Sequence, residues 1–215
     1  ILWGGNIQQK RQQLHVVPLP PHKDYERGRS LSYIDKLGEG FPTWRREARY
    51  LHKHDFMVYK NTAVTYFPDG ESFFADVIPR LRRAEHFIFL EYFILAEGRL
   101  WEQIFAILKD RVDHGVEVKI IFDDFGNITR MPAEIIDDMI RCGIEVAVFN
   151  PVHQYVNRLY FNYRDHRKIL CIDGDFAYTG GINIADEYAN LIRRFGHWKD
   201  SGVLLEGEGA WGLTR

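Results

Sequence analysis

A short segment of the chain carries an imidazole, an ammonium, a guanidinium and an amide at alternating positions. They belong to His166, Lys168, Arg164 and Asn162, and an apolar run at residues 169–172 follows them. Residues two apart in a strand point to the same face, so His166 and Lys168 share a face. Arg164 and Asn162 join them if the strand extends backward. Cationic groups that converge on one point bind an anion, and phosphate is the commonest anion that needs such a cradle.

The residues after this cluster predict a tight turn and a ligand-binding loop. Apolar runs flank Asp173 and Gly174, which is the pattern of a β-hairpin with a tight turn. Gly180 and Gly181 let the backbone approach a ligand closely, and the amide of Asn183 can donate two hydrogen bonds. We therefore expect this glycine–asparagine loop to contact the same anion as the preceding cluster.

These residue types suit the cleavage of a phosphodiester in two steps. A neutral imidazole can carry a phosphoryl group, so His166 is the candidate nucleophile. Lys168 and Asn183 would hold the non-bridging oxygens as charge builds in the transition state. A carboxylate must fix the imidazole tautomer, which is a role for Asp173 or for an acid outside the motif. We expect no metal and no cofactor, because Lys and Arg cannot ligate a metal ion and would repel it.

Strand-like and helix-like segments alternate from residue 54 onward. Runs of β-branched and aromatic residues predict strands, and apolar residues at helical spacing predict helices. The expected strands lie at 62–67, 87–90, 116–122, 144–149, 169–172 and 176–179, and the expected helices around 73–81, 100–108 and 135–140. This order predicts an α/β fold with a mixed, largely parallel sheet flanked by helices on both faces.

Polar residues follow the predicted strands at the edge where parallel sheets collect ligands. They are Glu91, Asp123, Asp124 and Asn150. Glu91 is a candidate substrate-binding residue for this reason. The alternative interpretation is that acids at these positions cap the helix or turn that follows.

The charge is unevenly distributed along the 215 residues. The net charge is −2, but segment 8–53 has ten basic and five acidic residues, so the remainder carries −7. The apolar start, Ile1-Leu2-Trp3, precedes this basic segment. The pattern indicates either the end of a membrane helix with its juxtamembrane flank or an ordinary solvated linker. We expect residues 1–53 to form this basic juxtamembrane or linker segment, and residues 54–215 to form one domain.

The spacing of the polar cluster resembles a known family motif. The series His166-x-Lys168-x4-Asp173 is similar to the HKD motif of the phospholipase D superfamily, and Gly180-Gly181-x-Asn183 resembles its usual continuation. Trp198-Lys199-Asp200 resembles the Trp-basic-Asp element that often comes next, and the surrounding sequence is similar to that of bacterial cardiolipin synthases. The resemblance covers roughly residues 54 to 205 and implies a phospholipase D-like half.

The resemblance implies an active site made of two such motifs in two facing halves. One His acts as nucleophile and the other as general acid and base. This chain has a single motif. A second half therefore has to come from a longer chain, in which this would be the N-terminal half, or from a second copy in a homodimer. We expect the isolated fragment to be inactive or weakly active.

The function implied by the resemblance is that of a phosphatidyltransferase. It would join two phosphatidylglycerols into cardiolipin and release glycerol, at the cytoplasmic face of the cell membrane and against its anionic surface. The alternatives are a phospholipase D-type phosphodiesterase, a single-motif nuclease acting as a homodimer, and a non-catalytic half that binds anionic head groups. A nuclease groove is expected to be strongly basic, so the −7 outside segment 8–53 argues against a nucleic acid as partner.

Overall fold

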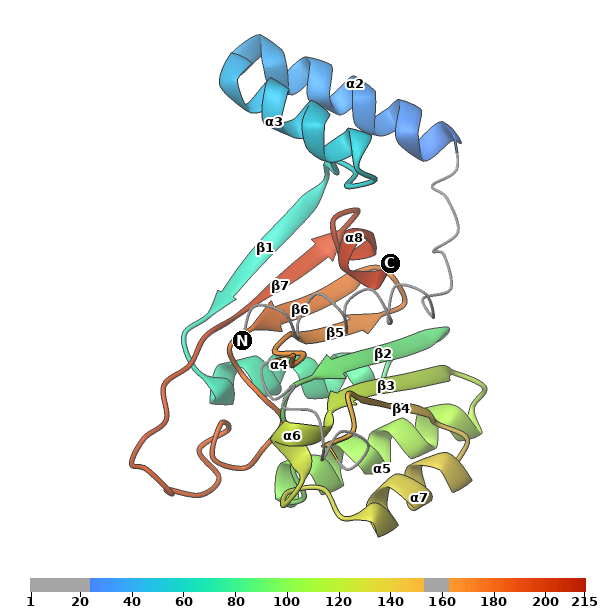
Figure 1. Cartoon of the computed structure of the whole chain (residues 1–215), viewed down its shortest axis with the longest axis vertical. Coiled ribbons are helices and arrows are strands. Elements are labelled where there is room, and N and C mark those ends of the chain that lie inside the picture. Colours follow the sequence, from blue (N-terminus) through green and yellow to red (C-terminus); the bar gives the residue numbers. More distant parts are fainter. Residues whose placement is uncertain (1–23, 153–162) are drawn as a thin grey trace.

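A computed structural model describes residues 24–152 and 163–215 of the chain (Figure 1). Its helices are α2 (Asp24–Gly40), α3 (Pro42–Lys53), α4 (Gly70–Leu81), α5 (Arg99–Asp113), α6 (Asp124–Asn127), α7 (Ala133–Arg141) and α8 (Ala210–Thr214). Its strands are β1 (Thr62–Phe67), β2 (Phe87–Tyr92), β3 (Glu117–Asp123), β4 (Glu145–Phe149), β5 (Lys168–Ile172), β6 (Phe176–Gly180) and β7 (Gly202–Gly207). Within these two ranges, every helix is too short or too polar to span a lipid bilayer.

The strands form one seven-stranded sheet in the order β1-β7-β6-β5-β2-β3-β4. β2, β3 and β4 are parallel, and they are joined by α5 and by the α6–α7 segment, as short strand–helix alternation predicts. The other four pairings are antiparallel. The mixed α/β class is therefore confirmed, but antiparallel pairings outnumber parallel ones, because β5, β6 and β7 continue the sheet beyond β2 with alternating directions and β1 adds to its edge.

The predicted hairpin joins β5 to β6. Ile172 pairs with Phe176, and Asp173 and Gly174 have φ angles of 55° and 80°. Residues 173–175 form the turn, in which the N–H of Asp175 donates to the carbonyl of Ile172 at 3.2 Å, and positive φ at Asp173 and Gly174 lets the chain reverse within three residues. The hairpin fixes the direction of β5 and so decides which end of the sheet carries His166 and Lys168.

The two faces of the sheet are covered to different extents. Ile88, Leu90 and Tyr92 of β2 point into the main core, where they pack with residues of α4, α5 and α7. The opposite face carries a smaller cluster in which Cys171 and Ala177 pack with Ala210 of α8. Helices thus lie on both faces, as predicted, and the larger apolar volume lies under α4, α5 and α7.

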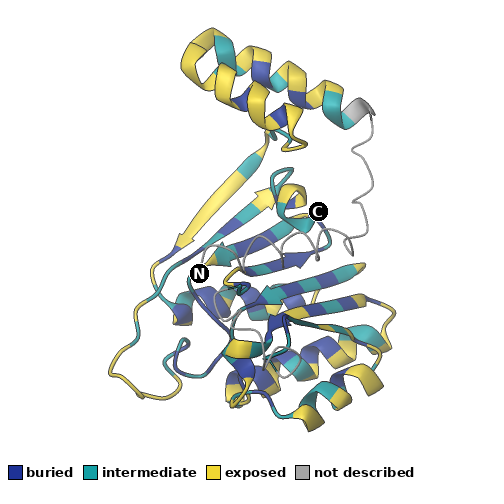
Figure 2. Ribbon diagram, in the orientation of Figure 1, coloured by how far each residue is buried: buried dark blue, intermediate teal, exposed yellow. Residues whose placement is uncertain are grey.

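The described part of segment 1–53 is helical. α2 and α3 form a hairpin that sits at one end of the molecule and leads into the start of β1 (Figure 1). Its links to the body include a hydrogen bond from the Tyr33 hydroxyl to Glu208 at 3.4 Å and an ion pair between Arg215 and Glu26 at 3.8 Å. Much of the hairpin surface is exposed, as is the edge strand β1, in contrast with the more buried strands in the middle of the sheet (Figure 2).

A long connection between β6 and β7 spans residues 181–201 and borders the candidate site. Asp186 ties it to the body by accepting hydrogen bonds from the backbone N–H groups of Arg99 and Leu100, at 3.1 and 2.8 Å. Leu95 and Ile184 form an isolated parallel bridge. These contacts give the connection a defined path and place Asn183 beside the segment that follows β2.

Candidate active site

The sequence motif brings four of its residues to one end of the sheet. Lys168 is the first residue of β5 and lies opposite Tyr92, the last residue of β2. Ile169 pairs with Thr179, so Lys168 and Gly180 lie at the same end of their strands. His166 precedes β5 by two residues, and Asn183 follows β6 by three. This is also the end at which the parallel strands β2 and β3 terminate, where ligands of such sheets bind.

His166 and Lys168 share an aromatic platform. The Lys168 ammonium lies 5.2 Å from the ring centre of Phe93, and the His166 ring lies 4.6 Å from the same ring. Nζ of Lys168 donates a hydrogen bond to the backbone carbonyl of His166 at 2.7 Å. His166 is exposed, whereas Lys168 is buried. The pair thus presents an accessible imidazole beside a cation that has little water around it.

The Lys168 ammonium is only partly compensated by its surroundings. Burial lowers the pKa of Lys168, and the negative charges of Asp200 and Asp165 oppose that shift. A buried cation without a close carboxylate partner gains stabilisation when an anion binds. This makes Lys168 suitable for holding a phosphate oxygen.

The loop after β6 contributes an oriented amide. Asn183 is buried, and its Oδ1 accepts a hydrogen bond from the backbone N–H of Ile94 at 2.9 Å. That bond fixes the orientation of the amide, whose nitrogen is a donor. Burial raises the pKa of Tyr188, and the nearby Asn183 side chain opposes that shift. The position of Asn183 suits donation to an anion at this end of the sheet.

Asp200 is a site residue that the candidate set from the sequence does not contain. It is half-buried, and its negative charge acts on Lys168. A Cβ at Gly181 would collide with its carboxylate, and a Cβ at Gly180 would collide with the carbonyl of Ser201. Because these two glycines have no side chain, residues 200–201 can lie close against the backbone at positions 180 and 181. The signal for Asp200 was present in the Trp198-Lys199-Asp200 element.

Asp173 lies far from His166, and this corrects the expectation that it orients the imidazole. Its carboxylate accepts hydrogen bonds from the backbone N–H groups of Glu85, His86 and Phe87, at 2.9, 2.8 and 2.9 Å. The spacing His-x-Lys-x4-Asp crosses the whole of β5, a distance of roughly 17 Å for five residues. The structure therefore gives Asp173 the role of fixing the β5–β6 turn against the start of β2.

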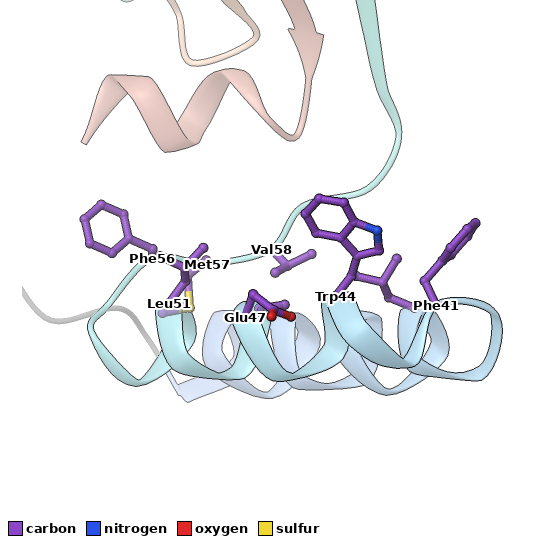
Figure 3. Close-up of a pocket in the computed structure, with 9 residues that line it drawn as sticks. Phe41, Trp44, Glu47, Leu51, Phe56, Met57 and Val58 are labelled. Atoms are coloured by element: carbon purple, nitrogen blue, oxygen red, sulfur yellow. The ribbon is translucent and has the colours of Figure 1, made fainter.

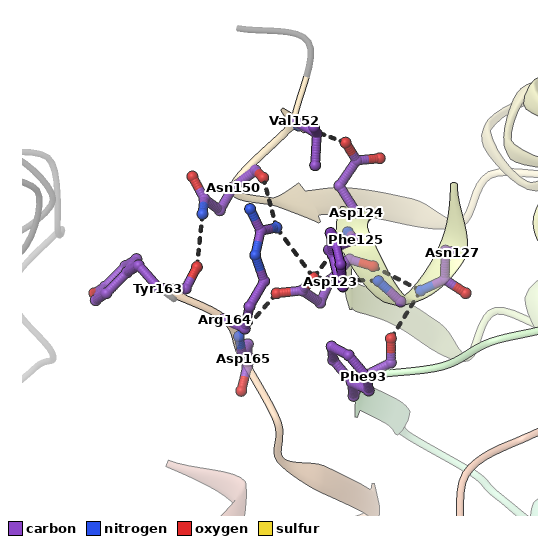
Figure 4. Close-up of polar contacts among 11 residues, drawn as sticks. Phe93, Asp123, Asp124, Phe125, Asn127, Asn150, Val152, Tyr163, Arg164 and Asp165 are labelled. Carbon is purple, nitrogen blue, oxygen red and sulfur yellow. Dashed lines mark hydrogen bonds and ion pairs between the residues drawn. The ribbon is translucent and has the colours of Figure 1, made fainter. Parts of the chain in front are cut away.

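Arg164 does not project toward the anion site as predicted. Its guanidinium donates to Oδ1 of Asp123 at 3.2 Å and to the carbonyl of Asn150 at 3.1 Å (Figure 4). Asp123 is fully buried, and its other oxygen accepts from the backbone N–H of Asp165 at 2.8 Å. A buried carboxylate requires such a partner, so Arg164 anchors the chain before His166. Asn162 lies outside the described residues.

The capping interpretation of the strand-end acids is confirmed for Asp123. Its Oδ1 also accepts hydrogen bonds from Phe125 at 2.9 Å and from Gly126 at 3.4 Å, at the first turn of α6 (Figure 4). Nearby, the carboxylate of Asp124 accepts from the backbone N–H of Val152 at 2.6 Å. These acids therefore shape the loops around the site.

Glu91 lies beside the His166 segment in a small acid–base network. Its carboxylate pairs with Arg167 at 2.5 Å, and Arg167 pairs with Asp165 at 3.1 Å. Burial, together with the hydrogen bond and the charge of Asp165, raises the pKa of Glu91 to about 7. Burial opposes ionisation of Asp165 as well, but hydrogen bonds from Glu91 and the Arg167 backbone hold its pKa below the usual value. Glu91 therefore takes up a proton more readily than Asp165, and the ion pairs of Arg167 with both carboxylates hold the residues on either side of His166.

This network predicts a pH dependence of folding stability. An acid whose pKa is raised on folding stabilises the fold below its unfolded pKa, and this contribution is lost as the pH rises through the folded value. The Glu91 contribution should therefore fall between pH 4.5 and about 7. We expect Glu91→Gln to remove this loss, so that its melting temperature relative to the wild type rises from pH 5 to pH 8. A difference that is constant with pH would contradict the raised pKa of Glu91.

The sequence that builds this geometry matches a family of known proteins. The model described as "Cardiolipin synthase, PLD-like domain" matches residues 77–193, which is more than half of the chain and includes His166, Lys168 and Asn183. The chain belongs to this family. The resemblance to the phospholipase D superfamily is therefore confirmed.

Relatives of this phospholipase D-like chain are longer than the chain itself. A Streptococcus mutans protein named "Uncharacterized protein" is 48% identical over 213 residues, which cover 99% of this chain and 45% of that protein. A cardiolipin synthase from Geobacillus kaustophilus is 33% identical over 163 residues, which cover 76% of the chain and 32% of the synthase. The chain thus spans less than half the length of these curated relatives.

Solved structures with the same fold include two small proteins. NucT from Helicobacter pylori superposes with a TM-score of 0.54 at 13% identity, covering 70% of this chain and 89% of NucT. The phospholipase D family member Nuc from Salmonella typhimurium gives a TM-score of 0.52 at 18% identity, covering 72% of this chain and 88% of Nuc. At these identities the likeness concerns the fold alone.

Proposed function

We propose that the chain supplies one half of the active site of a cardiolipin synthase. The observation that carries this is the pairing of an exposed imidazole with a buried ammonium, His166 and Lys168, against Phe93. The oriented amide of Asn183 lies at the same end of the sheet. The substrates would be two phosphatidylglycerols and the products cardiolipin and glycerol. Membership of a family described as cardiolipin synthase, and the identity to named cardiolipin synthases, support this substrate class.

In the first step, a nitrogen of His166 attacks the phosphorus of one phosphatidylglycerol. A P–N bond forms, the P–O bond to the head-group glycerol breaks, and a general acid protonates the departing alkoxide. Lys168 and Asn183 hold the two non-bridging oxygens as charge accumulates on them. Asp200, whose negative charge acts on Lys168, is the carboxylate that we propose to hold the imidazole and to stabilise it as it becomes positively charged.

In the second step, a hydroxyl of the second phosphatidylglycerol replaces the imidazole. The group that protonated the glycerol accepts the proton of this hydroxyl, the P–N bond breaks, and the new P–O bond completes cardiolipin. The chain carries one His-x-Lys-x4-Asp series, so the acid–base group would come from a second such half. That half is either a further part of a longer protein or a second copy of this chain. We place the reaction at the cytoplasmic face of the cell membrane, where an anionic surface presents the substrate.

The alternative is a phospholipase D-type phosphodiesterase or a nuclease that acts as a homodimer. This alternative needs a second copy of the chain, because the chain carries one His-x-Lys-x4-Asp series. The net charge of −7 outside segment 8–53 argues against a nucleic acid, because phosphate contacts dominate the affinity of nucleic-acid binding. Transfer and hydrolysis share the first step and differ only in whether an alcohol or water completes the second.

An assay with two substrates separates these functions. Phosphatidylglycerol vesicles and, separately, a single-stranded oligonucleotide are offered to the chain alone and to a longer protein in which a second His-x-Lys-x4-Asp half follows it. The proposal predicts cardiolipin and free glycerol from the vesicles with the two-half protein, little or no product with the chain alone, no cleavage of the oligonucleotide, and loss of the lipid products in His166→Asn. Phosphatidic acid as the main product would establish the phosphodiesterase, and a cut oligonucleotide would overturn the lipid assignment.

A further inference from the structure

The edge strand β1 is open along its outer side. It is the first strand in the sheet order, and within the described residues it pairs with β7 alone. Figure 1 shows no described element beyond it, and Figure 2 shows most of its length exposed. Residues 63–66 are exposed, and Val64 and Tyr66 are 64% and 63% accessible to solvent. The backbone N–H and C=O groups on the open side of such a strand can form a ladder with a further strand.

The sequence of β1 lacks the features that protect most edge strands from pairing. Native edge strands are usually blocked by a charged side chain, a proline or a bulge. None of the six residues of β1 is charged or a proline, and they pair with β7 in continuous register. The strand at the opposite edge, β4, carries Glu145, which forms an ion pair with Lys119 at 3.5 Å. Only the β4 edge therefore carries a charge against pairing.

The β1 sequence is complementary to itself in the antiparallel direction. A two-fold axis at Thr65 places this residue opposite its own copy, and each flanking residue opposite the one equally far on the other side. Val64 of one chain then lies opposite Tyr66 of the other, twice in the pair. A β-branched residue opposite an aromatic residue, and two threonines opposite each other, are both favourable cross-strand pairs. On the Thr65 face, small Ala63 lies opposite large Phe67.

Charges at the two ends of β1 fit the same arrangement. Lys60 is exposed two residues before the strand, and Asp69 lies two residues after it. Asp69 is negatively charged, because hydrogen bonds from the hydroxyl and the backbone N–H of Ser72 lower its pKa. Antiparallel pairing brings the Lys60 end of each chain beside the Asp69 end of the other, whereas parallel pairing would bring like charges together. This charge complementarity selects a second copy, in the antiparallel direction, as the partner of β1.

We propose that β1 pairs with β1 of a second copy of this chain, antiparallel and centred on Thr65, so that the two sheets become one. The pairing goes beyond the proposed function and does not complete the active site. β5 is three strands away from β1, so the two His166 residues would lie seven strand spacings apart, roughly 33 Å across the sheet. Each copy would still need a second His-x-Lys-x4-Asp half from elsewhere.

The interface formed by one strand pair is small. Stable interfaces bury about 1,200–2,000 Å², and smaller ones belong to weak or transient complexes. We therefore expect a reversible equilibrium between monomer and dimer, with the dimer populated as the concentration rises from micromolar toward millimolar.

Sedimentation equilibrium tests the inference with a pair of charge variants. Thr65→Lys and Thr65→Glu each set two like charges opposite each other at the axis, so each alone should dimerise about tenfold more weakly than the wild type. An equal mixture of the two should recover the wild-type affinity, because the mixed dimer sets lysine opposite glutamate. Ala147→Lys, at an exposed position in the middle of β4, is the matched control and should leave dimerisation unchanged.

A second exposed apolar surface provides the competing explanation for a dimer. The α2–α3 hairpin carries a groove of about 470 Å³ that is lined by Trp44, Leu51 and Phe56, among others (Figure 3). A dimer that Trp44→Ser disrupts and Thr65→Lys leaves intact would overturn the proposal, as would a wild type that stays monomeric at the highest concentration. Failure of the mixture to recover dimerisation would also overturn it. Absence of cardiolipin synthesis would contradict only the proposed function.

Discussion

Lys168→Met should weaken vanadate binding to the chain by about 10- to 100-fold, the loss expected when one charge-assisted hydrogen bond to an anion is removed. Vanadate serves here as a mimic of the phosphoryl group. Lys168 is buried at the end of β5 and contacts Phe93, so methionine retains its volume and removes its charge. Because burial already lowers the pKa of Lys168, loss of the charge should leave the melting temperature unchanged or raise it. Isothermal titration and thermal unfolding measure the two effects.

A second lysine provides the control for charge alone. Lys119 lies on β3 and pairs with Glu117 at 2.9 Å, away from the anion site. Lys119→Met should bind vanadate as the wild type does. In the phosphatidyl-transfer assay, Lys168→Met should lower the rate by about 10²–10³-fold, which is typical of removing one donor to a transition-state oxygen. Equal vanadate affinities for the two variants would mean that Lys168 does not hold the phosphate.

Asp173→Ala should destabilise the fold by about 3 kcal/mol and leave vanadate binding by the folded protein intact. The change removes a carboxylate that accepts three backbone hydrogen bonds, each normally worth about 1.5–3 kcal/mol to a charged group, and water replaces part of that loss. For a chain of this size the melting temperature should fall by roughly 6–12 °C. Denaturant unfolding and titration below the transition temperature measure the two quantities.

The neighbouring Asp175 provides the comparison for this turn. It is exposed, so Asp175→Ala should change stability by less than about 0.5 kcal/mol. If Asp173→Ala were fully stable and yet failed to bind vanadate, the acid of the motif would act in the site, and its placement at the β5–β6 turn would be contradicted.

The sequence pattern was sufficient to predict the class of fold and the residues that meet at one end of β5. Hydrophobic alternation and the Asp173–Gly174 turn determine the hairpin, and residue parity then places His166 and Lys168 together. Whether neighbouring strands pair parallel or antiparallel was less predictable, because strand propensity does not specify which neighbour a strand will pair with. The predominance of antiparallel pairings comes from β5, β6 and β7, whose order depends on contacts distant in sequence.

The roles of individual polar residues were harder to predict than their presence. Arg164 lies two residues before His166, so a strand would place both side chains on one face. Its guanidinium instead donates to buried Asp123, 41 residues earlier in the chain. Asp200 joins the site only because Gly181 leaves room for its carboxylate. Local spacing contains no information about either contact. The helices within segment 24–53 illustrate the same limit, since α3 is stabilised against α2 through ion pairs with Asp35.

A crystal structure of the chain with bound vanadate would test the central claim most directly. The account predicts a vanadium–nitrogen bond to the ring of His166, with vanadate oxygens at hydrogen-bond distance from Nζ of Lys168 and the amide nitrogen of Asn183. Asp200 should contact the imidazole in that complex. Vanadate bound instead at Arg167, or absent from the His166 end of β5 at saturating concentration, would contradict the assignment of this site to phosphoryl chemistry.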